Sequence, residues 1–501
     1  MANGLKKSVF ELKGCMQKIS PSDLKQFKNA AAALDKAFSR AAADNTVLTP
    51  YKALPLFERG PEVKTILAEE ICEMALPAIL DNGRNYLLSA QLRNSILGLA
   101  DNTRLIKDKF SILSDAYFIT YLTKRIPEGY GFIAYPGYML MESKDFAARF
   151  PVNPERYFEY TYPVVYELEG LRKYTDNSPI PGWMAFFFAK PAKMPEQTAL
   201  VKQKILEAVS AVERLNGRLI GLGGLSASLT KGGEYLLDKT SAHVTTGHGY
   251  TIANIINTML DAAKSVELSL KDAVIAVVGA AGSVGSGIAR MSATQGIKQL
   301  ILIDHRSLES TIQKVRQVSN VPVSVGSIAE DIGKAHIVLI ATSSQDVIFN
   351  PGNFRPGAII LDDSQPKNVA KNFISERPDI IVLEAGAVHL PKNFSYKVHR
   401  AFGPKLKHFH WNHINTPMAG KDEVPCCLAE VMLWSSLGEN RKNYSIGRSD
   451  PKLAEYLNAK GKLLGFNPAP LQSFGENVNE DRLNKVREIH KCAQERLQKK
   501  F

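Results

Sequence analysis

The chain has 501 residues, 45% of them hydrophobic and 22% charged, which is enough for two to four domains with separate cores. No apolar run approaches the ~18 residues that a membrane-spanning helix needs, which argues against an integral membrane protein. The formal net charge of +12 favours partners that carry negative charge. Because the N-terminus also lacks the apolar core of a secretory signal, we expect a cytoplasmic protein.

The first 130 residues are expected to form a mainly helical region, since apolar residues recur every three or four positions in segments such as 21–43. Between 130 and 191, aromatic segments separated by prolines predict strands. An amphipathic helix is expected over 195–216. Residues 218–226 predict a short strand that enters a glycine turn.

The middle of the chain alternates apolar strands with helical segments. Strands are expected over 274–279, 298–304, 335–343, 357–364 and 378–386, with a helix over 280–296. This alternation predicts an α/β fold with a doubly wound parallel sheet of the Rossmann type. We therefore assign 266–400 to a dinucleotide-binding domain. Residues 131–265, completed by 405–501, are expected to form a second α/β domain that binds the substrate or acyl group.

The loop GAAGSVG, residues 279–285, has glycines spaced as GxxGxxG between a predicted strand and a predicted helix. Gly279 permits the tight turn, Gly282 lets backbone N–H groups approach a pyrophosphate, and Gly285 lets the helix pack closely on the sheet. The sequence therefore predicts a dinucleotide site. Its other expected contacts are Ala281, Ser283 and Val284 in the loop, and Ala341, Thr342 and Ser343 after a neighbouring strand.

The second predicted strand of this domain ends in Asp304-His305-Arg306. A carboxylate at this position accepts a hydrogen bond from the ribose 2′-OH and favours NADH. The arginine two residues later would pair with a 2′-phosphate and favours NADPH. The sequence thus leaves both cofactors open.

Two cysteines stand side by side in DEVPCCLAEVMLW, residues 422–434. Because a cytoplasmic protein keeps its thiols reduced, a disulfide is not expected, and the absence of any CxxC pair argues against structural zinc. The segment predicts a helix with Cys426 and Cys427 in its first turn, where the helix dipole lowers a thiol pKa. Only one of the two can face a given pocket, and burial of both in the core remains open.

Histidines occur closely spaced in KHFHWNH, residues 407–413. A metal site there would need further ligands, and no CxxC pair supplies them. We expect a solvated basic loop and no bound metal.

From about residue 183 to 468 the chain resembles the long-chain acyl-[acyl-carrier-protein] reductases of the cyanobacterial type. The matching segments are GLGGLSASL (221–229), TTGHGYT (245–251), VVGAAGSVGSGIAR (277–290), LILIDHR (300–306), LDDSQPKN (361–368), CLAEVML (427–433), NYSIGR (443–448) and LGFNPAP (464–470). The resemblance implies that Cys427 is the nucleophile that takes up the acyl group, that NADPH is the reductant, and that Cys426 is a bystander.

Two further side chains are candidates for the site. His248, in TTGHGYT, would serve as an acid–base group or bind the thioester oxygen, and a turn-stabilising role is the alternative. Lys367, in QPKN, would bind a phosphate or orient the nicotinamide, and a structural role in its loop is the alternative.

The predicted activity is NAD(P)H-dependent reduction of a fatty acyl thioester to an aldehyde through a thioacyl-cysteine intermediate. One rival is an amino- or hydroxy-acid dehydrogenase that uses Lys367 with Asp362 and needs no thiol. Another is a non-catalytic nucleotide-binding scaffold in which the N-terminal helical region is the functional part.

The segment from Pro391 to Phe501 has 19 basic and 11 acidic residues, a balance of +8. This charge suits an acyl-carrier protein or acyl-CoA as acyl donor, with Lys405 and Lys407 as candidate contacts. A peripheral membrane contact and an aldehyde-consuming enzyme are further expected partners. Nucleic acid is not expected, because no aromatic residues are interleaved with the basic ones.

Overall fold

The computed structural model describes residues 128–135, 164–187, 189, 194, 196–214, 216–343, 349–364, 367–391, 397–400, 422–439, 444–448 and 450–498. The helical region expected over 1–130 lies almost wholly outside the described residues, as do the histidine segment 407–413 and Lys405. No helix within the described part is both long enough and apolar enough to cross a membrane.

The first sheet has the strand order β13-β2-β3-β1-β4-β5. Its strands are β1 (Gly129–Ala134), β2 (Val164–Glu169), β3 (Gly182–Phe186), β4 (Gly217–Leu222), β5 (His243–Thr245) and β13 (Lys397–Arg400). Strands β3, β1, β4 and β5 run parallel; at one edge, β2 pairs antiparallel with β3, and β13 pairs antiparallel with β2. The strands predicted between 130 and 191 are therefore present.

Helices cover both faces of this first sheet. Helix α10 (Thr198–Arg214), predicted from its amphipathic pattern, packs Val201 and Ile205 against Trp183 in one apolar cluster. Helix α17 (Cys426–Leu437) lies on the other face, where Val431 is so close to β4 that a Cβ on Gly221 would be 3.0 Å from it. The sheet thereby positions α17, which carries the two cysteines.

The second sheet is entirely parallel, in the order β11-β10-β9-β6-β7-β8. Its strands are β6 (Val274–Val278), β7 (Gln299–Ile303), β8 (Val323–Val325), β9 (Ile337–Ile340), β10 (Ile359–Asp362) and β11 (Ile381–Glu384). The predicted doubly wound Rossmann-type sheet is confirmed. Strand β8 was not expected, because it is only three residues long and its Val325 is exposed.

The remaining elements are short segments and the helices that flank or join the sheets. The helices are α11 (Leu225–Leu229), α12 (His248–Ser265), α13 (Ser283–Ala293), α14 (Glu309–Arg316), α15 (Ile328–Asp331), α16 (Phe373–Glu376), α18 (Pro451–Leu464) and α19 (Glu480–Gln498). Within the ranges given above, four 3₁₀ turns span Glu234–Leu236, Leu270–Asp272, Ile332–Lys334 and Pro351–Asn353. The short strands are β12 (Ala387–His389), β14 (Glu423–Pro425), β15 (Asn467–Pro468), β16 (Gln472–Ser473) and β17 (Glu476–Asn477).

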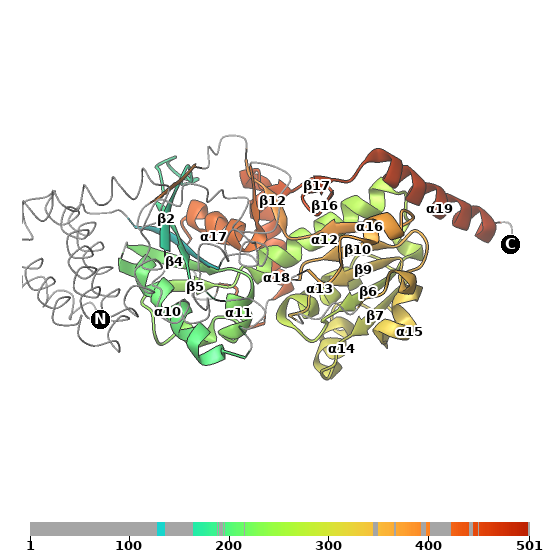
Figure 1. Ribbon diagram of the computed structural model, residues 1–501, viewed down its shortest axis with the longest axis horizontal. Helices are drawn as coiled ribbons and strands as arrows, with labels where there is room; N and C mark the ends of the chain where they lie inside the picture. The colour runs from blue at the N-terminus through green and yellow to red at the C-terminus, as the bar shows by residue number, and fades with distance from the viewer. Residues whose placement is uncertain are drawn as a thin grey trace, which may run out of the picture.

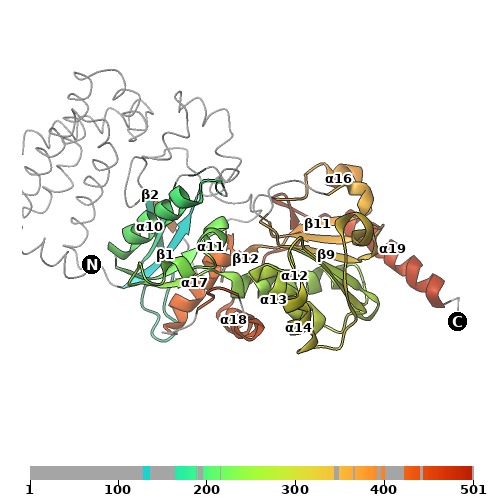
Figure 2. The same ribbon diagram turned by 90° about the horizontal axis from the view of Figure 1, so that it is seen from below.

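Helix α12 joins the two halves of the described structure. It packs against α13, α17 and α18, and one continuous apolar cluster runs from the first sheet through α12 to the second. Its Asn254 donates from Nδ2 to the carbonyls of Ala385 and Ala387, each at 3.0 Å. In Figures 1 and 2, α12 and α18 lie where the two sheets meet. This packing fixes the carboxyl ends of both sheets relative to each other.

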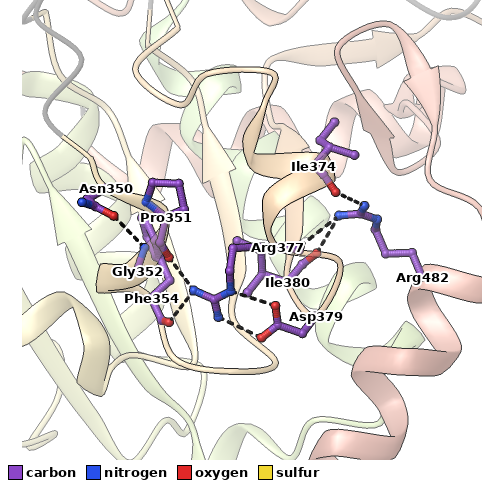
Figure 3. A network of polar contacts seen from close by, with 9 residues as sticks. All are labelled: Asn350, Pro351, Gly352, Phe354, Ile374, Arg377, Asp379, Ile380 and Arg482. Carbon is purple, nitrogen blue, oxygen red and sulfur yellow. Dashed lines mark hydrogen bonds and ion pairs between the residues drawn. The ribbon is translucent and has the colours of Figure 1, made fainter.

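Arg482 anchors the C-terminal helix α19 to the segment that enters β11 of the second sheet (Figure 3). Arg482 donates to the carbonyls of Ile380, at 3.0 Å, and of Ile374. Arg377 forms a two-pronged ion pair with Asp379, with both N···O distances at 2.8 Å. Arg482 thus fastens the start of α19, while the Arg377 pair holds the loop before β11. The far end of α19 projects from the rest of the described structure (Figure 1).

Two elements lie in the other half of the structure from the one to which the predicted domain limits assign them. Strand β13, inside the segment 266–400, pairs with β2 at the edge of the first sheet. Helix α19, inside 405–501, lies against the second sheet. Sequence patterns within an element do not report which sheet it joins, so the limits themselves stay predictions.

Candidate functional site

A cavity of about 550 Å³ lies where the carboxyl ends of the parallel strands of the two sheets face each other. It is lined from the second sheet by the glycine loop and the ends of β9, β10 and β11, and from the first half by the starts of α12 and α17 and the turn after β4. The predicted site residues that line it are Cys427, His248, Ala281, Gly282, Ser283, Val284, Arg306, Ala341, Thr342 and Ser343. The structure therefore brings the predicted thiol and the predicted nucleotide loop into one cavity.

The glycine loop lies at the point where the strand order of the second sheet reverses, between β6 and β9. There Val278 is opposite Ile303 on one side and Ile340 on the other. Gly279 has φ 83°, and a Cβ there would be 2.3 Å from the Ala341 carbonyl oxygen. A Cβ on Gly285 would be 2.1 Å from the Gly279 oxygen. Close backbone packing thus requires glycine at both positions. This packing keeps the loop free of side chains there and leaves the start of α13 open to a phosphate.

Asp304 has a side chain only 2% exposed, and both of its oxygens are occupied. It accepts from the Ala281 N–H at 2.9 Å and from Arg306 Nε and Nη2 at 3.0 Å each. Burial raises the pKa of the Asp304 carboxyl, but these donors outweigh it and hold the pKa below its usual value. His305 is exposed and does not line the cavity, whereas the half-exposed Arg306 does.

The two cysteines differ in access to the cavity. Helix α17 begins at Cys426, as predicted, with Pro425 as its N-cap. Cys426 is 2% exposed and belongs to the core, while Cys427 is half-buried and packs at the edge of that core. Gly247, at the start of α12, touches Cys427 so closely that a Cβ there would be 2.3 Å from the Cys427 Cα.

The lowered thiol pKa expected from the helix terminus is not found. Burial raises the pKa of Cys427 to about 12, although a backbone N–H of Gly224 donates to the sulfur and opposes the shift. A helix dipole contributes only about 0.3–1 kcal/mol to such an equilibrium, so desolvation outweighs it here. The thiol is therefore protonated at neutral pH and needs a proton acceptor in order to react.

His248 connects the first half of the structure to the glycine loop. Its Nδ1 is 3.0 Å from Ser283 Oγ, and that hydroxyl donates to the Gly447 carbonyl at 2.9 Å. Because the hydroxyl proton is already used, Nδ1 must carry the hydrogen and Nε2 is the acceptor nitrogen. Burial lowers the pKa of His248 to about 4, so the ring is neutral at pH 7. His248 thus ties the start of α12 to the glycine loop and lines the cavity.

Glu430, one turn after Cys427, brings three separate sequence segments together in the structure. This fully buried carboxyl accepts from the hydroxyl of Thr245 and from the Tyr250 N–H, the latter at 2.7 Å. It also bonds to the side chain of Ser445, from the NYSIGR segment. Glu430 and these three partners, the Glu430 hub, hold α17, the TTGHGYT loop and NYSIGR in a fixed arrangement around the thiol.

At the carboxyl end of β10, two neighbouring aspartates have different surroundings. Asp362 accepts from the N–H groups of Ser364, Asn368 and Val369 at 2.7–2.9 Å, and Lys367 donates to its carbonyl at 2.6 Å. The next residue, Asp363, lines the cavity together with Lys367. Asp362 therefore organises the loop, and Asp363 is the carboxyl that faces the site.

Other residues in the cavity wall were not found from the sequence. The Tyr135 hydroxyl accepts from the Leu225 N–H at 3.0 Å, and Asp363 and Glu384 end two neighbouring strands. Their position after apolar strand segments was a usable signal, because ligands bind at the carboxyl ends of parallel strands. Arg448 also lines the cavity and donates to Ser310 Oγ at 3.2 Å.

Residues 261–384 match the sequence model of the shikimate / quinate 5-dehydrogenase family. This match spans β6 to β11 and the glycine loop. The described residues have the fold of an NAD(P)-dependent oxidoreductase, and the protein binds NAD(P)(H).

Relatives resemble the chain over about half of its length. The long-chain acyl-[acyl-carrier-protein] reductase of Synechococcus elongatus is 25% identical over 285 residues, which cover 54% of this chain and 76% of that protein. The aminotransferase PigE of Serratia is 23% identical over 283 residues, 55% of this chain and 31% of PigE. The chain thus spans about a third of PigE. The NAD-dependent malic enzyme of Thermotoga maritima covers 74% of the chain at 12% identity, with 93% of its own chain aligned and a TM-score of 0.30.

Proposed function

We propose that the protein reduces a fatty acyl thioester to an aldehyde with NAD(P)H, by way of an acyl group held on Cys427. The observation that carries the proposal is the half-buried Cys427 thiol in the same cavity as the glycine loop and residues 341–343. The similarity to the Synechococcus acyl-[acyl-carrier-protein] reductase supports the same reaction.

In the first step the sulfur of Cys427 attacks the thioester carbonyl carbon and expels the donor thiol, which leaves a thioacyl enzyme. The Tyr135 hydroxyl, which follows β1 and lines the cavity, is available to stabilise the carbonyl oxygen, because it accepts from the Leu225 N–H and can donate its own hydrogen. When bound, the nicotinamide supplies the hydride that reduces the thioester. Loss of the Cys427 sulfur then frees the aldehyde.

The cofactor is held by the start of α13 at its pyrophosphate and by residues 341–343 toward the nicotinamide. We propose a preference for NADPH. Asp304 is turned inward on Ala281 and Arg306, so its oxygens are not available to a ribose 2′-OH, whereas Arg306 lines the cavity. Burial lowers the pKa of Lys314, and the nearby charges of Arg448 and Arg290 lower it further, so three cations gather where a 2′-phosphate would suit them.

The acyl donor is an acyl-carrier protein or acyl-CoA in this proposal. Arg448 and Lys231 give the cavity wall positive charge, which suits the phosphates of either donor.

The rival reaction is direct hydride transfer to an amino or hydroxy acid. The pair expected for it, Lys367 with Asp362, is not available, because the Asp362 carboxylate accepts three backbone N–H groups. Lys367 and Asp363 do line the cavity, so turnover with hydroxy or amino acids remains a worthwhile comparison.

The test is acyl transfer without a reductant. Wild-type protein is incubated with radiolabelled palmitoyl groups carried by CoA or by an acyl-carrier protein. We expect hydroxylamine-labile label on Cys427, its loss in Cys427→Ser, and its retention in Cys426→Ser. Protein that remains unlabelled with both donors would contradict the proposal.

A further inference from the structure

Asp363 is a cavity-facing carboxyl that no described residue satisfies by a hydrogen bond to its side chain. It lies half-buried at the end of β10, beside Asp362, whose own carboxylate is fully used by the loop. A Cβ on Gly386 would be 2.7 Å from Asp363 Oδ1, and the Gly386 carbonyl accepts from the Cys426 N–H at 2.9 Å. One glycine therefore touches both this carboxyl and the first residue of α17.

The charges around Asp363 favour a single proton shared with the thiols. Lys367 and Asp362 come from its own loop, Glu384 from β11, Cys426 and Cys427 from α17, and His248 from α12. Burial raises the pKa of Asp363 to about 7, which Lys367 opposes and Asp362 increases. The negative charge of Asp363 in turn adds to the raised pKa of Cys427. A carboxylate and a thiolate therefore disfavour each other here, and transfer of one proton from sulfur to oxygen forms the thiolate without placing a second negative charge in the cavity.

The other candidate acceptor is His248. Its pKa of about 4 makes its Nε2 a weak base, while a group with a pKa near the working pH is the better proton carrier. His248 is also fixed through Nδ1 to Ser283 on the glycine loop, on the cofactor side of the cavity.

We propose that Asp363 is the proton acceptor for the Cys427 thiol during acyl transfer and the proton donor to the departing thiol. The carboxylate takes the proton from sulfur as the new S–C bond forms at the thioester carbonyl. When the C–S bond of the donor breaks, the departing thiolate sulfur takes this proton from Asp363. No electrons change hands in this exchange, and Asp363 ends as it began. This inference rests on the proposed acyl-transfer reaction.

The experiment compares two reactions of Cys427 across pH 5.5 to 9 in wild type, Asp363→Asn and Asp363→Glu. Asp422→Asn removes an exposed carboxyl five residues before Cys427 and is the matched control. The first reaction is single-turnover transfer from palmitoyl-CoA without nicotinamide, followed by rapid quench and peptide mass. The second is alkylation of Cys427 by iodoacetamide, which needs no proton donor for a leaving thiol. Denaturant midpoints and NADPH binding report whether each variant is intact.

In wild type we expect the transfer rate to rise with pH to a plateau, with an apparent pKa near 7. Asp363→Asn should lose this rise of rate with pH, the limb of the profile. It should transfer the acyl group about 10²-fold more slowly, a usual size for loss of general acid–base catalysis. Its alkylation should be unchanged or faster, because a negative charge beside the thiol is gone. Asp363→Glu should keep the limb, and Asp422→Asn should match wild type.

Intact Asp363→Asn protein that transfers at the wild-type rate, or more slowly but with the same limb, would overturn the role of Asp363 and leave the proposed function standing. Wild-type protein that alkylates at Cys427 but takes no acyl group would overturn the proposed function, and the proton role with it.

Discussion

Replacing Gly247 with alanine should separate the start of α12 from the start of α17 and so displace the Cys427 thiol. Gly247 has φ 75°, and its added Cβ would be 2.3 Å from the Cys427 Cα and 2.5 Å from its Cβ. Ordinary contact begins at 3.4 Å, so the two backbones must move apart by about 1 Å. A left-handed residue other than glycine costs about 1–2 kcal/mol, and overpacking about 1–3 kcal/mol more.

We therefore expect Gly247→Ala to lower the free energy of unfolding by about 2–5 kcal/mol, measured by denaturant titration. Gly296→Ala is the matched control, because Gly296 has φ 72° but nothing within 4 Å of an added Cβ. It should cost only the backbone term, about 1–2 kcal/mol. A displacement of about 1 Å should also slow acyl transfer to Cys427 by about 10²-fold. Equal stability losses in the two variants, with unchanged transfer in Gly247→Ala, would refute this contact.

Three other predictions concern separate parts of the structure. Arg306→Ala should raise the KM for NADPH about tenfold or more, with little change in the KM for NADH. Asp304→Ala should weaken the binding of both cofactors, because it removes the acceptor of the Ala281 N–H. Steady-state kinetics with each cofactor measures both effects. Glu430→Gln should destabilise the fold by about 1–3 kcal/mol in denaturant titration, since one amide nitrogen must face an N–H or O–H donor, and a stability equal to wild type would contradict the hub. Burial lowers the pKa of His336 to about 4 from the usual 6.5, so the unfolded chain binds the extra proton and the stability should fall as the pH drops from 6.5 to 4. His336→Gln should flatten that slope.

The sequence was informative where one local segment carries the whole signal. The glycine loop and the two cysteines in the first turn of α17 are set by neighbours a few residues away, and both are confirmed in position. The pKa of the thiol is different, because burial raises it and Gly224 and Asp363 act on it from other elements, and there the expected lowering was wrong.

The hub around Glu430 shows the same limit from the opposite direction. Its contact with Thr245 joins residues 185 positions apart, so no local pattern could indicate it. Likewise, β13 joins the first sheet after the chain has completed the second, and neither periodicity nor composition records that return.

The central claim is that hydride from the bound nicotinamide reduces an acyl group held on Cys427. Acyl-enzyme is prepared with palmitoyl-CoA, freed of excess donor, and mixed with NADPH that carries deuterium at the transferable position. The account predicts palmitaldehyde with deuterium at its carbonyl carbon, in an amount equal to the acyl-enzyme consumed, and a free Cys427 thiol afterwards. Acyl-enzyme that decays to unlabelled fatty acid at the same rate with and without NADPH would contradict it.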